Sequence, residues 1–169
     1  SDSIGIQNYI LKQYKMSSKY IPYGAEKVNS PDITVLDKYG LTNNNYNMLI
    51  ARMEPENNIE VILDGITKTS DKTTFLVIGK CDNAFGKHLK NKFKSQKNIN
   101  FLGGIYNIED LNNLRYYSKL YFHGHSVGGT NPSLLEAMAS HALIIAHKNE
   151  FNNSILGEDA FYFSSSDEV

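Results

Sequence analysis

Short apolar runs alternate along the chain with stretches in which apolar residues recur every three or four positions. The first pattern is typical of buried strands, and the second is typical of helices packed on one face. Seven runs are expected strands, at residues 19–22, 47–52, 74–79, 99–102, 120–123, 142–146 and 160–163. Because strands alternate with helical segments, the sequence predicts an α/β domain with a mainly parallel sheet.

Two segments between these strands carry clear helix signals. One has apolar residues at the spacing of a single helix face, which gives it a stripe to bury against the sheet. These residues are Ile59, Ile62, Leu63 and Ile66. In the other segment, Asn107 is placed to cap a helix whose first turn contains Glu109 and Asp110, and acidic residues are favourable at that positively polarised end.

The sharpest helix start is Asn131-Pro132. Asparagine is a preferred capping residue, and proline suits the first helical position because it has no N–H to lose there. The pattern after it predicts a buried stripe made by Leu134, Leu135 and Met138.

Composition excludes several protein classes. The 169 residues are 41% apolar and 21% charged, and 17 basic against 18 acidic residues give a net charge of −1, so no overall attraction to nucleic acid follows. A single cysteine, Cys81, excludes a disulfide framework. No apolar run is long enough for a membrane span, and the N-terminal residues lack the basic and apolar regions of a signal peptide. The final Ser-Ser-Ser-Asp-Glu-Val is a helix start without its helix, so we expect a piece of a longer protein.

Residues 83–108 contain five lysines and no acidic residue. The lysines are Lys87, Lys90, Lys92, Lys94 and Lys97. We interpret this run as the solvated face of a helix, and the alternative is a patch that attracts an anionic membrane surface or an acidic partner.

Residues 124–128 match G-x-S-x-G, the nucleophile elbow of α/β-hydrolases. An elbow needs a helix directly after the serine, whereas Pro132 would break that helix. The triad order also requires an acid and then a histidine after Ser126, and neither His141 nor His147 leaves room for an intervening strand with its own acid. A hydrolase using Ser126 therefore stays only as an alternative.

Other chemical motifs are weak or absent. No G-x-G-x-x-G or phosphate-binding loop is present, and no Asp-x-Asp offers the carboxylate pair of a metal-dependent sugar transferase. His123 and His125 offer two metal ligands without a third, so we expect packing or hydrogen-bonding roles and no metal.

The carboxyl ends of two expected strands carry groups suited to a phosphorylated ligand. Arg52 ends one strand, and a glycine-rich loop at 124–130 follows another and opens the helix at Asn131. In open α/β sheets ligands bind at these strand ends, and a helix N-terminus attracts anions. We predict that they cradle a diphosphate, and that Glu136, on the same helix face, accepts two ribose hydroxyls. Separately, each signal also fits a surface ion pair, an ordinary turn or a solvated helix residue.

Five segments, in order along the chain, resemble the C-terminal, donor-binding domain of family 4 GT-B glycosyltransferases. They are Ile-Pro-Tyr-Gly-Ala at 21–25, Ala-Arg-Met-Glu-Pro-Glu-Asn-Asn-Ile at 51–59, Phe-Leu-Val-Ile-Gly at 75–79, Asn-Phe-Leu-Gly-Gly-Ile at 100–105 and Pro-Ser-Leu-Leu-Glu-Ala-Met-Ala-Ser at 132–140. The segment from His123 to Met138 is similar to a subset of bacterial rhamnosyltransferases.

The resemblance implies a Rossmann-like three-layer domain over residues 1–169, one half of a two-domain enzyme. It implies that Arg52 contacts the donor diphosphate, that Glu136 holds the ribose, and that the amides of Gly129, Thr130 and Asn131 face phosphate oxygens. It implies that Ile105 and Tyr106 frame the base.

The chain departs from the family pattern at two positions. Gly128 stands where the family has the first glutamate of its E-x7-E element, and Asn57 stands where it has a lysine. His125 or Thr130 would then substitute in contacting the donor.

The function implied is a retaining hexosyltransferase that takes dTDP-rhamnose or a UDP-sugar as substrate, without a cofactor or metal. Its partners would be an N-terminal acceptor-binding domain of the same protein and a glycan or lipid-linked acceptor for surface polysaccharide, in the cytoplasm at the inner face of the membrane. The isolated chain should bind nucleotide and transfer little sugar. A degenerate, non-catalytic nucleotide-binding module and a GT-B sugar-nucleotide epimerase stay open as alternatives.

Overall fold

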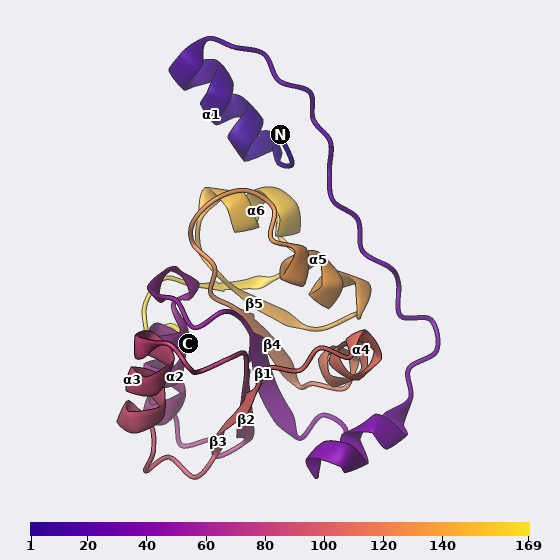
Figure 1. Ribbon diagram of the computed structural model, residues 1–169, viewed down its shortest axis with the longest axis vertical. Coiled ribbons are helices and arrows are strands. Elements are labelled where there is room, and N and C mark those ends of the chain that lie inside the picture. Colours follow the sequence, from indigo (N-terminus) through magenta and orange to yellow (C-terminus); the bar gives the residue numbers. More distant parts are fainter.

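The computed structural model describes residues 1–169, and it contains one six-stranded sheet in which every neighbouring pair is parallel (Figure 1). The strands are β1 (Tyr46–Ile50), β2 (Thr74–Ile78), β3 (Ile99–Gly103), β4 (Leu120–His123), β5 (Ile144–His147) and β6 (Phe161–Phe163). Their order across the sheet is β3-β2-β1-β4-β5-β6. The prediction of an α/β domain with a parallel sheet is confirmed.

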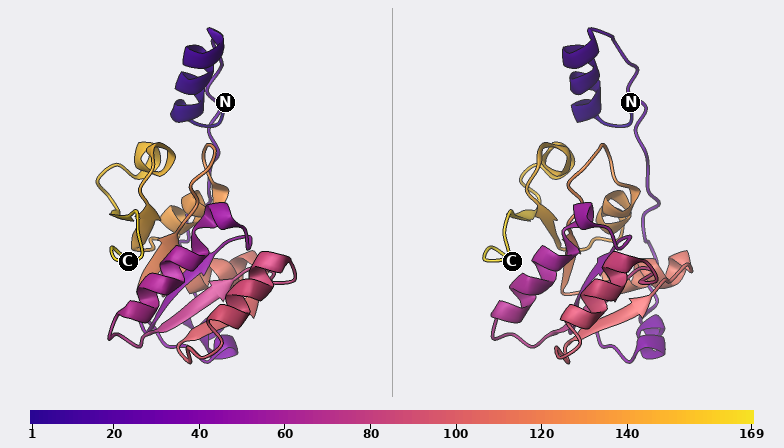
Figure 2. Two further views of the ribbon diagram at one scale, coloured as in Figure 1. Left: turned by 90° about the vertical axis from the view of Figure 1, so that its left-hand side faces the viewer. Right: turned by 60° about the vertical axis from the view of Figure 1, so that its left-hand side comes forward.

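Helices cover both faces of this sheet. They are α1 (Ile4–Tyr14), α2 (Ile59–Lys68), α3 (Ala84–Lys92), α4 (Ile108–Tyr116), α5 (Pro132–Ala139) and α6 (Glu150–Leu156), with two 3₁₀ turns, η1 (Ile33–Tyr39) and η2 (Pro55–Asn57). Helices α2 and α3 lie over one face, and α4, α5 and η1 lie over the other (Figures 1 and 2).

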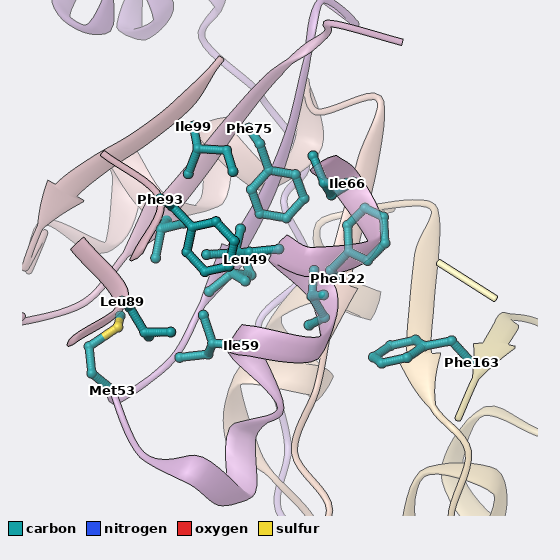
Figure 3. Packing of buried hydrophobic residues seen from close by; sticks show 13 residues of the cluster. Leu49, Met53, Ile59, Ile66, Phe75, Leu89, Phe93, Ile99, Phe122 and Phe163 are labelled. Atoms are coloured by element: carbon teal, nitrogen blue, oxygen red, sulfur yellow. The ribbon is translucent and has the colours of Figure 1, made fainter. Parts of the chain in front are cut away.

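The two faces bury separate apolar clusters, because successive strand side chains point to opposite sides. In β1, Leu49 joins the cluster under α2 and α3, whereas Met48 joins the cluster under α4 and α5. Figure 3 shows the first cluster, in which the Phe75 and Phe122 rings lie 5.3 Å apart beneath Ile59 and Ile66 of α2. The predicted apolar face of α2 is therefore confirmed as a core-facing stripe.

Asparagine caps begin several helices, as the sequence predicts. The Asn107 side chain accepts a hydrogen bond from the Asp110 N–H at the start of α4. Asn131 does the same for the Ser133 N–H at the start of α5, with Pro132 at the first helical position.

The predicted strand at 19–22 is wrong. Ile21 is 65% exposed, and its N–H bonds only to the Ser1 carbonyl, so no sheet neighbour accepts the backbone groups that a strand must pair. This segment connects α1 to the rest of the chain as an extended strap, and α1 stands away from the sheet, next to α6 (Figures 1 and 2). A short apolar run therefore formed no strand here, because the segment does not lie beside the sheet.

The predicted buried stripe of α5 needs one correction. Leu134 is fully buried and Leu135 is half-buried, but Met138 is 40% exposed and Ala137 is buried in its place. The sheet lies close to α5 at this point, so the small Ala137 faces it and the longer side chain points outward.

The lysine run has the solvated character expected of it. All five lysines are exposed, and Lys92 forms ion pairs with Glu60 and Asp64 of α2. None of the helices combines the length and the hydrophobicity that crossing a membrane would require.

Substituting Leu134 by Ala should lower the free energy of unfolding by about 2–5 kcal/mol, because it leaves a cavity between α5 and the sheet. The matched variant Met138→Ala, one turn later on the same helix, should change it by less than about 1 kcal/mol, since that side chain is already 40% exposed. Urea unfolding of both variants measures the difference. Equal losses would mean that Met138 is buried in solution.

Candidate functional site

The order of the strands reverses between β1 and β4, and a cavity of about 510 Å³ lies at the carboxyl ends of these strands and of β2. The chain runs from β1 outward to β2 and β3, and then returns to β4 on the other side. At such a switch the loops after β1 and β4 diverge to opposite faces and leave a crevice. The cavity occupies the place where this fold class binds ligands.

Six of the ten predicted site residues line the cavity. They are Arg52, Asn57, Ile105, Tyr106, His125 and Asn131. Arg52 follows β1 and Asn131 caps α5, so the predicted cation and the predicted helix N-terminus do face one space. The Arg52 side chain is exposed and has no hydrogen-bond or ion-pair partner in the chain, which leaves its donors free for a ligand.

Gly128, Gly129 and Thr130 do not line the cavity, and the last two contact the start of the chain instead. The Thr130 hydroxyl donates to the Asp2 carbonyl at 2.9 Å, and a Cβ on Gly129 would lie 2.7 Å from an Asp2 carboxylate oxygen. Gly128 has φ +91°, a conformation that favours glycine. Of the three residues whose amides were predicted to face phosphate oxygens, Gly129, Thr130 and Asn131, only Asn131 lines the cavity.

Glu136 also lies outside the cavity lining, one turn beyond the α5 N-terminus. Its carboxylate pairs with the Arg115 guanidinium, which is fully buried and also donates to Asn112. The Glu136 side chain is 35% exposed, so the carboxylate keeps one accessible side. A sequence pattern could not have found Arg115 as its partner, because the pair joins α4 to α5.

Several hydrogen bonds fasten the turn after β1 to the loop after β4. Asn58 Nδ2 donates to the Gly124 carbonyl at 2.8 Å, and the Ser126 N–H donates to the Glu56 carbonyl at 3.0 Å. A Cβ on Gly124 would lie 2.0 Å from the Asn57 carbonyl oxygen, so only glycine allows this approach. The two rims of the cavity are held at a fixed separation.

Asn57 and His125 extend this junction into the cavity. Asn57 is buried, donates through Nδ2 to the Arg52 carbonyl at 2.8 Å, and places Oδ1 2.8 Å from His125 Nδ1. The His125 carbonyl accepts from Asn149 and Asn152 of the α6 region at 3.1 and 3.0 Å. Burial is the main cause that lowers the pKa of His125.

His123 ends β4 beneath His125, with the ring centroids 6.3 Å apart. It is 4% exposed, and its Nε2 has no hydrogen-bond partner. Burial lowers the pKa of His123 to about 3, so the ring is neutral. The chain contains no group of three or more His, Cys, Asp or Glu side chains placed to hold a metal ion.

The geometry at Ser126 does not form a nucleophile elbow. Helix α5 begins at Pro132, not directly after the serine, and the Ser126 hydroxyl donates to the Glu56 carbonyl at 2.9 Å. Its hydrogen is therefore engaged with backbone, and no histidine accepts it.

Further lining residues were not predicted from the sequence, and one group of them comes from the end of β2. Lys80 lies 5.7 Å from the centre of the Tyr106 ring, and Asp82 and Asn83 complete that wall. The signal was available, since Gly79-Lys80 follows a predicted strand just as Arg52 does. Asn83 also caps α3 and donates to the Met53 carbonyl, which ties this wall to the turn after β1.

Comparison with known proteins gives a family match. The family model described as "Glycosyl transferases group 1" matches residues 36–167. No curated protein sequence matches the chain.

Solved structures share the fold. The structure of Alr3699/HepE from Anabaena in complex with UDP-glucose has a TM-score of 0.83 at 18% identity, over 99% of this chain and 50% of that one. A glycosyltransferase from Rickettsia africae ESF-5 has a TM-score of 0.80 at 18% identity, over 99% and 49%. The C-terminal domain of LpcC, a glycosyl transferase group 1 family protein from Francisella tularensis, has a TM-score of 0.64 at 22% identity, over 83% and 78%. The chain thus spans about half the length of the first two proteins, and the predicted Rossmann-like three-layer fold is confirmed.

The buried His123 should make stability depend on pH. Its pKa is about 3 in the folded chain and near 6.5 unfolded, so below pH 6.5 the unfolded chain takes up a proton that the folded chain excludes. The contribution of the neutral His123 to the free energy of unfolding is fully present above about pH 6.5. It falls by up to about 1.4 kcal/mol per pH unit as the pH decreases toward 3. Urea unfolding at pH 7, 6 and 5 measures the free energy of unfolding. It should decrease less steeply with falling pH in His123→Phe than in the wild type, and equal slopes for the two proteins would contradict this prediction.

Proposed function

The chain belongs to the glycosyl transferases group 1 family, and we propose that it binds the nucleotide-diphosphate sugar donor of a glycosyltransferase. The observation that carries the proposal is the unpaired Arg52 on the same cavity as the N-terminus of α5. Family membership supports transfer as the reaction, and the UDP-glucose bound in the similar HepE structure supports a nucleotide sugar as ligand.

The diphosphate is proposed to lie between Arg52 and Asn131. The N–H of Asn131 donates no hydrogen bond within the chain, and the partial positive charge of the helix N-terminus adds to that of the guanidinium. During transfer, negative charge develops on the leaving diphosphate, and fixed donors of this kind stabilise it without reorganising. These groups would do the neutralising that a metal ion does in other transferases.

The nucleoside is proposed to extend from the diphosphate toward Glu136 on one side and Ile105 and Tyr106 on the other. The accessible side of the Glu136 carboxylate is the acceptor offered to ribose hydroxyls, while its other side pairs with Arg115. The exposed Tyr106 ring, which is 75% accessible, is offered to the base.

The finer assignments follow from the family resemblance and belong to the same proposal. They are a family 4, rhamnosyltransferase-like branch, dTDP-rhamnose or a UDP-sugar as donor, retention of configuration, and a glycan or lipid-linked acceptor for surface polysaccharide at the cytoplasmic face of the membrane. Because the chain spans half of the similar proteins, acceptor binding is proposed to lie in an N-terminal domain, and this chain alone should transfer little sugar.

A second candidate is a nucleotide-binding module that has lost its function. It is favoured by Asn57 and Gly128, which leave the cavity without the lysine and glutamate that the family pattern places there. Titration calorimetry of the chain with UDP and dTDP separates the two, since a degenerate site should bind neither nucleotide.

Substituting Arg52 by Ala should weaken the binding of UDP by about 10- to 100-fold, the effect of losing a hydrogen-bonded charge. The binding of uridine, which has no phosphate, should change less than about 2-fold. Lys87→Ala, an exposed cation on α3, is the matched control and should change neither. If calorimetry shows that the affinities for UDP and for uridine fall equally, Arg52 does not contact the diphosphate.

Substituting Glu136 by Gln should weaken UDP binding by about 1.5–3 kcal/mol, because a neutral amide accepts ribose hydroxyls less strongly than a carboxylate. The binding of 2′,3′-dideoxyuridine diphosphate should be nearly unchanged. Circular dichroism must show a folded variant, since the change leaves Arg115 without its counter-charge. Wild-type affinity for UDP in the folded variant would show that Glu136 does not contact the ribose.

A further inference from the structure

The orientation of the Asn57 amide is fixed by its two neighbours. The Arg52 carbonyl can only accept a hydrogen bond, so the Asn57 NH₂ group must face it. The Asn57 oxygen therefore faces His125 Nδ1 at 2.8 Å, and an oxygen can only accept. It follows that His125 Nδ1 carries the ring hydrogen.

The main chain that carries this ring is held in place. The His125 carbonyl accepts from Asn149 and Asn152, and the preceding Gly124 carbonyl accepts from Asn58. Residues 124 and 125 are therefore fixed from two sides. The bond between Nδ1 and Asn57 then orients the ring, and His125 lines the cavity.

The second ring nitrogen is the group left over for a ligand. His125 Nε2 makes no hydrogen bond within the chain, unlike Nδ1, and it is not among the fully buried unpaired atoms. In a neutral ring with Nδ1 protonated, Nε2 has a lone pair and no hydrogen. Burial is the largest effect on the pKa of His125 and lowers it, as the Arg52 charge also does. The Glu56 carboxylate raises it, and so does the nearby Val127 carbonyl, which does not meet hydrogen-bond geometry with either ring nitrogen.

A lone pair of this kind selects for hydrogen-bond donors. It repels phosphate oxygens, which have no hydrogen at neutral pH, and it accepts from a hydroxyl. Next to the diphosphate proposed to lie at Arg52 and Asn131, the part of a nucleotide sugar rich in hydroxyls is the sugar itself. The two residues therefore offer the donor's hexose a fixed acceptor.

We propose that His125 Nε2 accepts a hydrogen bond from a hydroxyl of the donor hexose, and that Asn57 is the positioning residue that holds the ring in the required tautomer. This inference rests on the proposed function and adds to it the part of the donor that these residues recognise. Its consequence is that the chain binds a sugar nucleotide more tightly than the corresponding nucleoside diphosphate.

The first test needs no variant. ¹⁵N NMR of the histidine side chains in the 169-residue chain should show His125 with a protonated Nδ1 and an unprotonated Nε2. Adding a sugar nucleotide should shift the Nε2 resonance of His125 upfield, as acceptance of a hydrogen bond does, and adding UDP alone should shift it much less. A protonated Nε2, for example one donating to the Val127 carbonyl, would overturn the inference.

The second test measures the preference for the sugar. Calorimetry compares the affinity of the chain for UDP-glucose, UDP-galactose and dTDP-rhamnose with its affinity for UDP and dTDP. The sugar nucleotide whose affinity most exceeds that of its own nucleoside diphosphate is then used with the variants, and this excess is the gain to be measured. Asn57→Leu and His125→Phe should each reduce this gain by about 3- to 10-fold, the size of one hydrogen bond between neutral groups. In Asn57→Leu the ¹⁵N spectrum should also move toward the Nε2-protonated tautomer.

Asn91→Leu is the matched control. It makes the same replacement as Asn57→Leu at an exposed position of α3 that does not line the cavity. It should leave the tautomer and the preference for the sugar unchanged. If His125→Phe retains the preference of the wild type, the sugar contact is wrong while nucleotide binding stands. If the wild-type chain binds none of these nucleotides, the proposed function itself fails.

Discussion

The rest of the site depends on one close contact between backbones. The turn after β1 and the loop after β4 meet where Gly124 lies against the Asn57 carbonyl, and hydrogen bonds from Asn58 and Ser126 close the contact on both sides. These two segments leave neighbouring parallel strands at the point where the strand order reverses, so they would otherwise diverge. Because they are joined, Arg52, Asn57 and His125 share one rim with fixed spacing.

The charged and titratable groups near this junction form two sets, one at the cavity and one deeper in the fold. At the cavity, Arg52 is an unpaired cation, whereas burial lowers the pKa of both His123 and His125. Deeper in the fold, the only fully buried cation, Arg115, is compensated by Glu136, and burying such a charge without a partner is strongly unfavourable. The positive charge at the cavity therefore comes from Arg52, from Lys80 after β2 and from the start of α5.

Sequence patterns were sufficient for the sheet and for two of the helix starts. The strands from β1 to β6 were found because each is a short run rich in apolar residues, and the caps at Asn107 and Asn131 are local chemistry. The strand at 19–22 and the burial of Met138 could not be judged in the same way, since each depends on how near the sheet lies. Arg52 and Asn131 were found from their place after strands, but the link from Asn57 to His125 and the pairing of Glu136 with Arg115 join residues far apart in sequence.

The contact at Gly124 has a consequence for how such a site can diversify. Main-chain atoms form both sides of this contact, so no side-chain substitution at position 57 changes it, and position 124 has room only for glycine. Any change of ligand must therefore come from residues that project from this rigid frame, such as those at positions 57, 125 and 106. Laboratory evolution of the chain toward a new ligand should accumulate its useful changes there and leave position 124 untouched.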